Sequence, residues 1–253
     1  MVKVIMHGCN GRMGTIISDL AEKDENIEIV AGVDPTGKGR FGYPVFYSIS
    51  DCDVDADVVI DFSNISAVPE LLAYCTEKKV PCVLCTTGLG SELIEEVAKA
   101  SEKVAILKSA NMSLGINLLM KLLKEASQVL ANAGFDIEIV EKHHNQKLDA
   151  PSGTAIALAD SINEEFDGAY EYVFDRSQRR AKRDAKEMGI SAVRGGSIVG
   201  EHDVIFAGPD EVITFSHTAY SRAVFGKGAV EAAKYLAGKA PGMYGMSDVI
   251  NGE

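Results

Sequence analysis

Three glycines between a short apolar strand and a helix constrain this chain more than any other feature. Gly8-Cys-Asn-Gly11-Arg-Met-Gly14 follows the apolar residues 2–6, and hydrophobic residues then recur at helical spacing. In such a unit the first glycine allows a tight turn, the second lets backbone amides reach a pyrophosphate, and the third permits close packing of helix on sheet. Asp34, 20 positions after Gly14, would accept hydrogen bonds from ribose hydroxyls. The pattern predicts a dinucleotide site; the alternative is an ordinary glycine-rich turn and an acid that merely ends a strand.

The residues after Asp34 bear on the choice of nucleotide. Pro35 occupies the usual position of an arginine that binds a 2′-phosphate, and a carboxylate repels that phosphate, so the sequence favours NADH. Lys38 and Arg40 lie close enough in the same loop to accept NADPH. The expected cofactor is therefore NADH, NADPH or both, with a preference for NADH.

Two further segments follow expected strands of the same unit. Thr86-Thr87-Gly88 lies at the carboxyl end of a strand, where the crevice of an open parallel sheet should meet the nicotinamide half, although an ordinary strand-to-helix turn is the alternative. Ala110-Asn111-Met112-Ser113 follows the next strand, and capping of a helix would by itself explain Ser113.

The order of elements predicts the fold class. Apolar strands near residues 2–6, 27–33, 57–62, 80–86 and 104–107 alternate with helices near 67–79 and 91–101, which indicates a doubly wound parallel sheet of the Rossmann type, an α/β fold. From about residue 116 the pattern changes to a long helix, an alternating strand at 135–141, a helix at 154–166 and three strand candidates at 190–193, 198–206 and 212–218. This block predicts an α+β insertion with an open mixed sheet, one face covered.

A final helix at residues 223–236 resembles those of the first half. We therefore expect a dinucleotide-binding domain of residues 1–114 plus 223–253, and an inserted substrate-binding and oligomerisation domain of residues 115–222. The basic run from Arg176 to Lys186 is interpreted as a solvated loop or helix face in preference to a ligand site.

Composition excludes several classes of protein. The chain has a formal net charge of −12, which argues against nucleic-acid binding because neutralising phosphates requires a concentrated basic face. No apolar run reaches the roughly 18 residues of a membrane span. The five cysteines are odd in number and irregularly spaced, as expected for reduced thiols. Cys82 and Cys85 match CxxC, but a strand would point them to opposite faces. We expect a cytoplasmic protein without membrane association.

The segment of residues 141–155, with the sequence EKHHNQKLDAPSGTA, carries most of the expected chemistry. Adjacent histidines could be surface accidents, and metal binding with Glu141 and Asp149 is another alternative, although no zinc-type spacing accompanies the pair, so no metal is expected. Ser152-Gly153-Thr154 after a proline predicts a helix start that can seat an anion. A histidine can supply a proton near neutral pH, and Lys147 adds an ammonium group. The combination describes a small carboxylated substrate held beside a proton donor.

These segments closely resemble the 4-hydroxy-tetrahydrodipicolinate reductase (dihydrodipicolinate reductase) family of the bacterial diaminopimelate and lysine pathway. The same resemblance includes the stretch Arg194-Gly-Gly-Ser-Ile-Val-Gly200-Glu-His202. The resemblance runs along essentially the whole chain, and the stretch HHxxKxDAPSGT is highly specific to that family. It implies NAD(P)H-dependent reduction of an unsaturated dicarboxylate ring, and a homotetramer in contact through its open sheets.

The resemblance also implies a role for individual residues. His143 takes the position of the proton donor and acceptor, and Lys147 that of a second proton donor. The substrate-binding positions are His144, Ser152, Gly153 and Thr154. The cofactor positions are Gly8, Cys9, Asn10, Gly11, Arg12, Met13, Gly14, Asp34, Cys85, Thr86, Thr87, Ala110, Asn111, Met112 and Ser113. The family commonly has glycine where this chain has Cys85, a change that a backbone contact would survive.

Two other functions remain open at this point. Another two-domain NAD(P)-dependent oxidoreductase would share the glycine turn; a semialdehyde dehydrogenase would need a nucleophilic cysteine in its second domain, yet every cysteine precedes residue 86. A non-catalytic NADH-binding sensor would bind cofactor without substrate-dependent oxidation, and it should carry a module for DNA or a protein partner that the sequence does not show.

Overall fold

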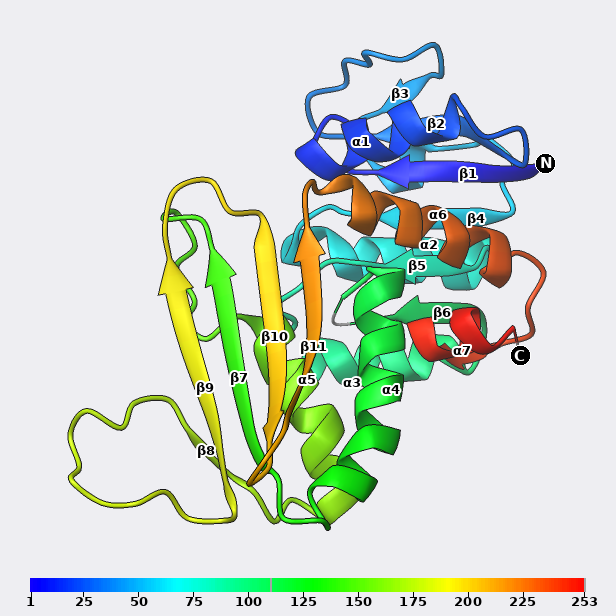
Figure 1. The fold of residues 1–253 in the computed structure, drawn as a ribbon. Coiled ribbons are helices and arrows are strands. Elements are labelled where there is room, and N and C mark those ends of the chain that lie inside the picture. The colour runs from blue at the N-terminus through cyan, green and yellow to red at the C-terminus, as the bar shows by residue number, and fades with distance from the viewer. Residues whose placement is uncertain (110, 253) are drawn as a thin grey trace. The chain divides into compact units, whose positions relative to one another are not determined.

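The structure is a computed structural model that describes residues 1–109 and 111–252. The chain forms two compact units, one of Met1–Leu114 with Arg222–Glu253 and the other of Gly115–Ser221 (Figure 1). The predicted cofactor position Ala110 lies outside the described residues.

The first unit is built on a parallel sheet. Its described strands run in the order β12-β6-β5-β4-β1-β2-β3, and every pair of neighbours is parallel. The strands are β1 (Val2–His7), β2 (Ile27–Val33), β3 (Val45–Phe46), β4 (Val58–Asp61), β5 (Cys82–Leu84), β6 (Ala105–Lys108) and β12 (Gly242–Tyr244). The helices are α1 (Arg12–Ala21), α2 (Val68–Lys78), α3 (Ser91–Ser101), α6 (Ala223–Leu236) and α7 (Met246–Asn251), with 3₁₀ turns at Ile49–Asp51 and Ile65–Ala67.

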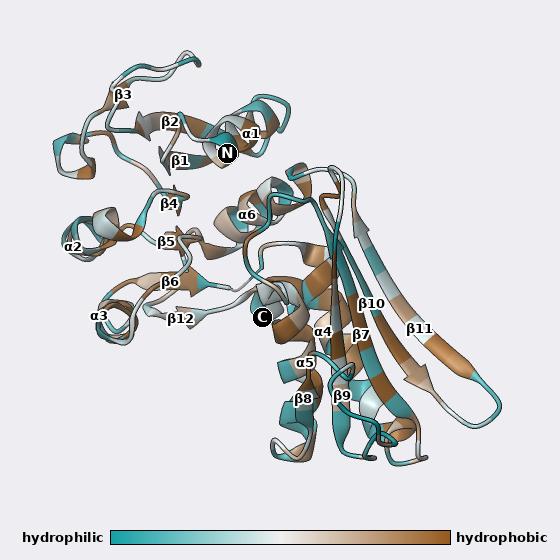
Figure 2. Ribbon diagram, turned by 90° about the vertical axis from the view of Figure 1, so that its left-hand side faces the viewer, coloured by the Kyte–Doolittle hydropathy of each residue, from teal (hydrophilic) through white to brown (hydrophobic). Residues whose placement is uncertain are grey.

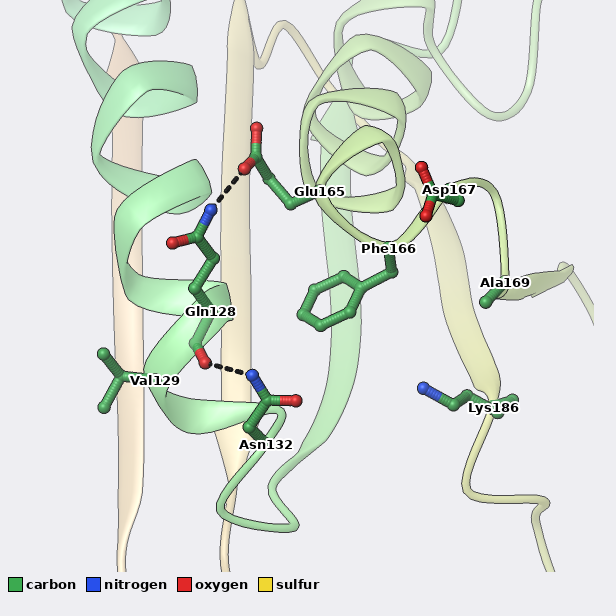
Figure 3. Close-up of a pocket in the computed structure, with 8 residues that line it drawn as sticks. All are labelled: Gln128, Val129, Asn132, Glu165, Phe166, Asp167, Ala169 and Lys186. Carbon is green, nitrogen blue, oxygen red and sulfur yellow. Dashed lines mark hydrogen bonds between the residues drawn. The ribbon is translucent and has the colours of Figure 1, made fainter.

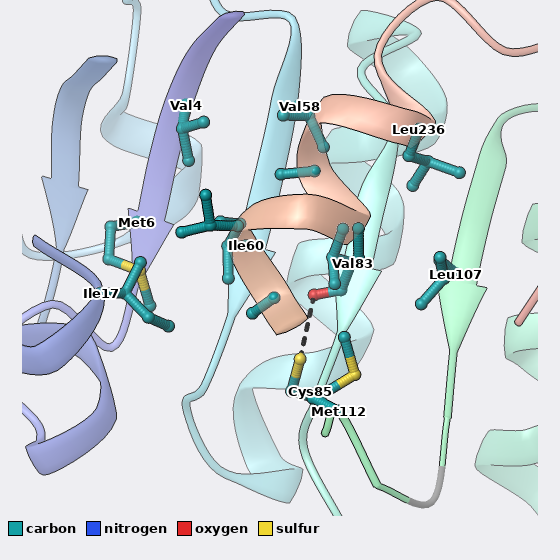
Figure 4. Close-up of a cluster of buried hydrophobic side chains, with 14 of the residues drawn as sticks. Val4, Met6, Ile17, Val58, Ile60, Val83, Cys85, Leu107, Met112 and Leu236 are labelled. Atoms are coloured by element: carbon teal, nitrogen blue, oxygen red, sulfur yellow. Dashed lines mark hydrogen bonds between the residues drawn. The ribbon is translucent and has the colours of Figure 1, made fainter. Parts of the chain in front are cut away.

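Helices cover both faces of this sheet, because its central strands are apolar on both sides. On one face Val4, Ile60 and Val83 pack with α1, α6 and α7 (Figure 4). On the other face alternate residues of the same strands pack with α2 and α3. Cys85 belongs to the first cluster and Cys82 to the second, so the two thiols point to opposite faces as the strand period predicts. The doubly wound prediction is confirmed.

The second unit has a five-stranded sheet in the order β11-β10-β7-β9-β8. Its strands are β7 (Asp136–His143), β8 (Glu171–Val173), β9 (Glu187–Arg194), β10 (Gly200–Ala207) and β11 (Val212–Ala219), and its helices are α4 (Leu114–Leu130) and α5 (Gly153–Asn163), followed by a 3₁₀ turn at Glu164–Phe166. β10 runs antiparallel to β7 and β11, whereas β9 runs parallel to β7 and β8, so the sheet is mixed as predicted.

Burial alternates along β7 and β10, as the banded hydropathy of this sheet illustrates (Figure 2). The inward residues pack against α4 and α5, with Ile139, Val204 and Phe206 fully buried and Leu123 and Leu158 among their helical neighbours. The other face is half-buried and carries ion pairs. One face of the sheet is therefore covered, and β7 ends beside the start of α5, where the amide of Ser152 binds Glu141.

The basic run was interpreted as a solvated face, and only part of that interpretation holds. Residues 174–186 do form a loop, but three of its arginines pair with acidic residues of the sheet. Arg176 donates to Glu138 at 2.8 and 3.0 Å, and Arg179 pairs with Glu187, which is almost fully buried. Arg183 pairs with Asp136. The acids on β7 and β9 fix the loop to the sheet, and sequence spacing alone cannot show a pairing between distant segments.

Candidate functional site

The glycine turn of the first unit is packed so closely that Gly8 and Gly14 could not carry a side chain. Gly8 has φ 82°, and a Cβ there would lie 2.5 Å from the carbonyl oxygen of Phe62. A Cβ on Gly14 would lie 2.3 Å from the carbonyl oxygen of Gly8, so α1 begins directly against the turn. Gly11 is the N-cap of α1, and Arg12 and Met13 open the helix. The turn therefore presents backbone at the positive end of a helix, a surface that fits a pyrophosphate.

Asp34 lies beside this turn, immediately after β2. Its carboxylate accepts hydrogen bonds from the amide of Asn10 at 3.2 Å and from the amide and hydroxyl of Thr36 at 3.0 and 2.8 Å. Burial opposes its ionisation, but the hydrogen bonds from Thr36 and Asn10 outweigh burial and lower the pKa of Asp34. The acid is thus ionised at neutral pH and held against the glycine turn, as a ribose ligand requires.

A second buried acid joins the carboxyl ends of three neighbouring strands. Asp61, at the end of β4, is fully buried and accepts a hydrogen bond from the Thr86 hydroxyl at 2.6 Å, while its other oxygen lies 2.9 Å from Nδ1 of His7. Thr86 is consequently fixed just beyond β5, and Thr87 is exposed beside it. In the next loop, the amide of Ser113 donates to the side-chain oxygen of Asn111 at 2.8 Å. These loops lie at the sheet edge where a dinucleotide binds in such folds.

The histidine segment lies at the end of β7 in the second unit. His143 is the last residue of the strand, and its Nδ1 is 2.6 Å from Oε2 of Glu141. Lys147 follows in the loop, with its Nζ 2.9 Å from Oδ1 of Asp149. Burial lowers the pKa of His143, although the Glu141 carboxylate opposes that shift. The imidazole is therefore neutral more readily than a free histidine and can exchange a proton near neutral pH.

Ser152 is the N-cap of α5 and is almost fully buried. Its hydroxyl oxygen accepts from the amide of Ala155 at 3.1 Å and lies 3.2 Å from Nε2 of His202, while its own amide donates to Glu141 at 2.9 Å. Gly153 and Thr154 are the first two residues of the helix, at its positive end, and the Gly153 amide donates to the carboxylate of Asp149. This helix start has the geometry of a carboxylate seat.

One pocket of the second unit lies away from the predicted residues. One open pocket of about 670 Å³ lies between α4 and the turn after α5 and is lined by Gln128, Asn132, Phe166 and Lys186 among others (Figure 3). It belongs to the second unit but contains none of the predicted substrate positions. Among residues 1–109 and 111–252, no cluster of three or more His, Cys, Asp or Glu side chains is arranged to hold a metal ion.

Comparison with known proteins identifies the family. The family model described as "Dihydrodipicolinate reductase, N-terminus" matches residues 2–112, and the model described as "Dihydrodipicolinate reductase, C-terminus" matches residues 115–250. The chain belongs to the dihydrodipicolinate reductase family. A 4-hydroxy-tetrahydrodipicolinate reductase of Caldanaerobacter subterraneus subsp. tengcongensis is 53% identical over 252 residues, 99% of this chain and 98% of that protein. One of Clostridium tetani is 50% identical over 251 residues, with the same coverage of both chains.

A solved structure supports the same assignment. The dipicolinate-bound dihydrodipicolinate reductase from Paenisporosarcina sp. TG-14 is similar with a TM-score of 0.81 and 25% identity, covering 97% of each chain. A probable dehydrogenase from Thermotoga maritima, 14% identical with a TM-score of 0.62 over 99% of this chain and 93% of that one, shares the fold alone. The resemblance seen in the sequence is thus confirmed at the level of the family.

Hydrogen bonds bring the predicted residues together in two groups, one in each unit. In the first unit Asn10 and Asp34 are in direct contact, whereas Thr86 is fixed through Asp61. In the second unit His143 and Ser152 both bind Glu141. Neither buried acid was predicted to have a role.

The sequence contains a signal for only one of these acids. Glu141 and His143 are two apart on a strand and so lie on one face, which predicts their contact. Asp61 ends an apolar strand and accepts from Ser63 two residues on, but its partners His7 and Thr86 come from β1 and from the loop after β5, which local sequence does not show.

Proposed function

We propose that this chain reduces 4-hydroxy-tetrahydrodipicolinate to tetrahydrodipicolinate with NADH or NADPH, a step of diaminopimelate and lysine biosynthesis. The observation that supports it most strongly is the joining, through Glu141, of a histidine to a helix start that can seat a carboxylate, in a chain whose whole length matches the reductase family. The cytoplasm, where the reduced nucleotide is available, is the proposed compartment.

The proposed cofactor site is the glycine turn with Asp34 and the loops after β5 and β6. The turn would bind the pyrophosphate through backbone amides, and Asp34 would accept from the ribose hydroxyls. A carboxylate at this position, followed by Pro35, favours NADH, while Lys38 and Arg40 allow NADPH. When bound, the nucleotide supplies a hydride to the substrate ring.

The substrate would be held by its two carboxylates. The amides of Gly153 and Thr154 would seat one carboxylate at the start of α5, with Ser152 as the N-cap that fixes them. Lys147, whose present partner Asp149 is exposed, can turn its ammonium to the substrate, and His144 lies between Lys147 and His143 in the same segment. These groups orient a dianion by charge and hydrogen bonding.

The proposed proton donor is His143, assisted by Lys147. Hydride addition leaves an electron-rich enamine, and the protonated imidazole donates its Nε2 proton to the adjacent carbon. Nδ1 is committed to Glu141, so Nε2 is the nitrogen that exchanges a proton. A Cβ at residue 200 would lie 3.1 Å from Nε2, and Gly200 thus keeps the space beside this nitrogen open.

We further propose a homotetramer that associates through the uncovered face of the five-stranded sheet. That face carries the half-buried side chains of Val140 and Ile205 among ion pairs such as Lys142 with Glu201. Light scattering should give four chains per particle; a monomer at micromolar concentration would refute the assembly.

The function is tested by following absorbance of NADH with enzymatically generated 4-hydroxy-tetrahydrodipicolinate. We expect oxidation that requires both protein and substrate, with competitive inhibition by dipicolinate. His143→Ala should lower turnover by about 100-fold or more, the usual contribution of a general acid, with NADH binding retained. NADH binding without substrate-dependent oxidation would favour the sensor alternative.

A further inference from the structure

Glu141 is a buried carboxylate that binds three separate segments of the second unit. It is fully buried, although taking a carboxylate out of water is costly unless strong partners replace the water. Its Oε2 accepts from Nδ1 of His143 at 2.6 Å, and its Oε1 accepts from the amide of Ser152 at 2.9 Å. Arg194, at the end of β9, donates to both oxygens at 2.7 Å. Each of its oxygens thus accepts two hydrogen bonds.

This arrangement connects the two halves of the proposed substrate chemistry. The His143 ring supplies the proton, and Ser152 is the residue before the two amides that would seat the carboxylate. Both of them bind the same carboxyl group. A displacement of Glu141 would therefore move the proton donor and the anion seat together.

We propose that Glu141 is a positioning residue that fixes the nitrogen of His143 from which the proton leaves and, through Ser152, sets the start of α5. This inference rests on the proposed function. Glu141 remains ionised throughout: His143 loses its Nε2 proton to the substrate carbon, keeps its Nδ1 proton against Glu141, and regains a proton from solvent. The role parallels that of the carboxylate behind a catalytic histidine in other enzymes, which holds the ring and stabilises its charged form.

Ser152 is held in place by contacts of both its amide and its hydroxyl. Its amide donates to Glu141, and its hydroxyl oxygen accepts from the amide of Ala155 and lies 3.2 Å from Nε2 of His202. Burial lowers the pKa of His202 to about 4, so its ring is neutral near pH 7. Ser152 is therefore fixed through its amide and its hydroxyl, and it caps the helix whose first two residues are Gly153 and Thr154.

The charges around His143 predict opposite effects for two substitutions. Glu141 on β7 favours the protonated ring, whereas Arg194 on β9 and Lys147 in the following loop disfavour it; the neutral His202 ring on β10 lies 5.1 Å away, centroid to centroid. Removing the negative charge should lower the pKa of His143, and removing Arg194 should raise it. Shifts of opposite sign would show that both charges act on the His143 ring, and the kinetic effects of the same variants show whether that action matters for turnover.

The principal variant is Glu141→Gln, and Glu187→Gln is its matched control. Glu187 is also an almost fully buried carboxylate of this sheet that pairs with arginines, Arg176 and Arg179, but it does not touch the histidine segment. For Glu141→Gln we expect kcat to fall about 10- to 100-fold, by analogy with carboxylates that orient a metal-bound histidine, whose removal has effects of this size. The alkaline limb of the kcat/KM profile should move to lower pH, and dipicolinate should bind more weakly. Glu187→Gln should leave that limb in place.

The decisive readout is the titration of His143 by nitrogen-15 NMR, which needs no turnover. We expect Nδ1 to be the protonated nitrogen of the neutral ring in the wild type, the ring pKa to fall in Glu141→Gln, and to rise in Arg194→Gln. If the wild type has no reductase activity, the proposed function fails while this titration still tests Glu141. An unchanged His143 titration in both variants, or wild-type kinetics in Glu141→Gln, would overturn the inference. If Glu141→Gln does not fold, two other measurements test the inference: the His143 tautomer in the wild type and the shift of the His143 pKa in Arg194→Gln. A neutral ring protonated at Nε2, or an unshifted pKa, would then contradict the role of Glu141.

Discussion

Replacing Gly228 by alanine should uncouple helix α6 from the loop that follows β6. A Cβ at Gly228 would lie 1.6 Å from the carbonyl oxygen of Met112, less than half the 3.4 Å at which ordinary contact begins. The obstacle is backbone, which cannot rotate away, so Met112 or the whole helix must move by more than an ångström. Met112 lies between the proposed cofactor residues Asn111 and Ser113.

The size of the effect follows from two opposing contributions. Overpacking a well-packed core costs about 1–3 kcal/mol, and contact with backbone places Gly228→Ala near the upper end. Alanine in a helix interior gains about 1 kcal/mol over glycine. The free energy of unfolding should therefore fall by roughly 1–2 kcal/mol. Because the loop moves, NADH should also bind at least about tenfold more weakly, about 1.4 kcal/mol.

Gly226→Ala is the control in the same helix. A Cβ there would meet Ile16 and Leu20 at 3.0 Å, but the atoms met are ends of side chains that can adjust. Its gain in helix propensity should offset the crowding, leaving stability within about 1 kcal/mol of wild type. Urea unfolding and fluorescence titration with NADH measure both variants. Equal behaviour of the two alanine variants would refute the steric argument.

Three further predictions concern charge. Lys147→Ala should reduce kcat/KM by at least about tenfold with a raised KM, because the ammonium orients a dianion; steady-state kinetics with an unaltered KM would contradict this. Asp34 predicts a kcat/KM for NADH at least equal to that for NADPH, and Asp34→Asn should move the ratio toward NADPH; a strong wild-type preference for NADPH would refute it. The pKa of His202 is lowered to about 4 by burial, so the unfolded chain binds its proton first as pH falls. Stability should thus decline between about pH 6.5 and 4, by up to about 3 kcal/mol, and the slope should lessen in His202→Gln.

Local patterns predicted the elements of both units well. The glycine turn, the apolar parallel strands and the final helix Ala223–Leu236 are each specified within a short stretch of chain, and the structure has them at or near the predicted residues. The strands that were not predicted, β3, β8 and β12, have two or three residues each, too few to show a period. Long-range pairing decides whether such segments become strands.

The site was predictable in its residue types and less so in its contacts. The family resemblance singled out His143, and the sequence predicted a helix start at Ser152. The partners that complete this site, Arg194 on Glu141 and His202 on Ser152, lie 53 and 50 residues further along the chain. The same limit applies to the basic loop, whose arginines find acids on β7 and β9. Contacts across a sheet depend on strand order and register, which local sequence does not encode.

A crystal structure with dipicolinate bound would test the proposed substrate site. We expect one carboxylate within about 2.7–3.2 Å of the amide nitrogens of Gly153 and Thr154, and the ring beside Nε2 of His143. Dipicolinate bound away from the start of α5, with His143 remote from its ring, would contradict it.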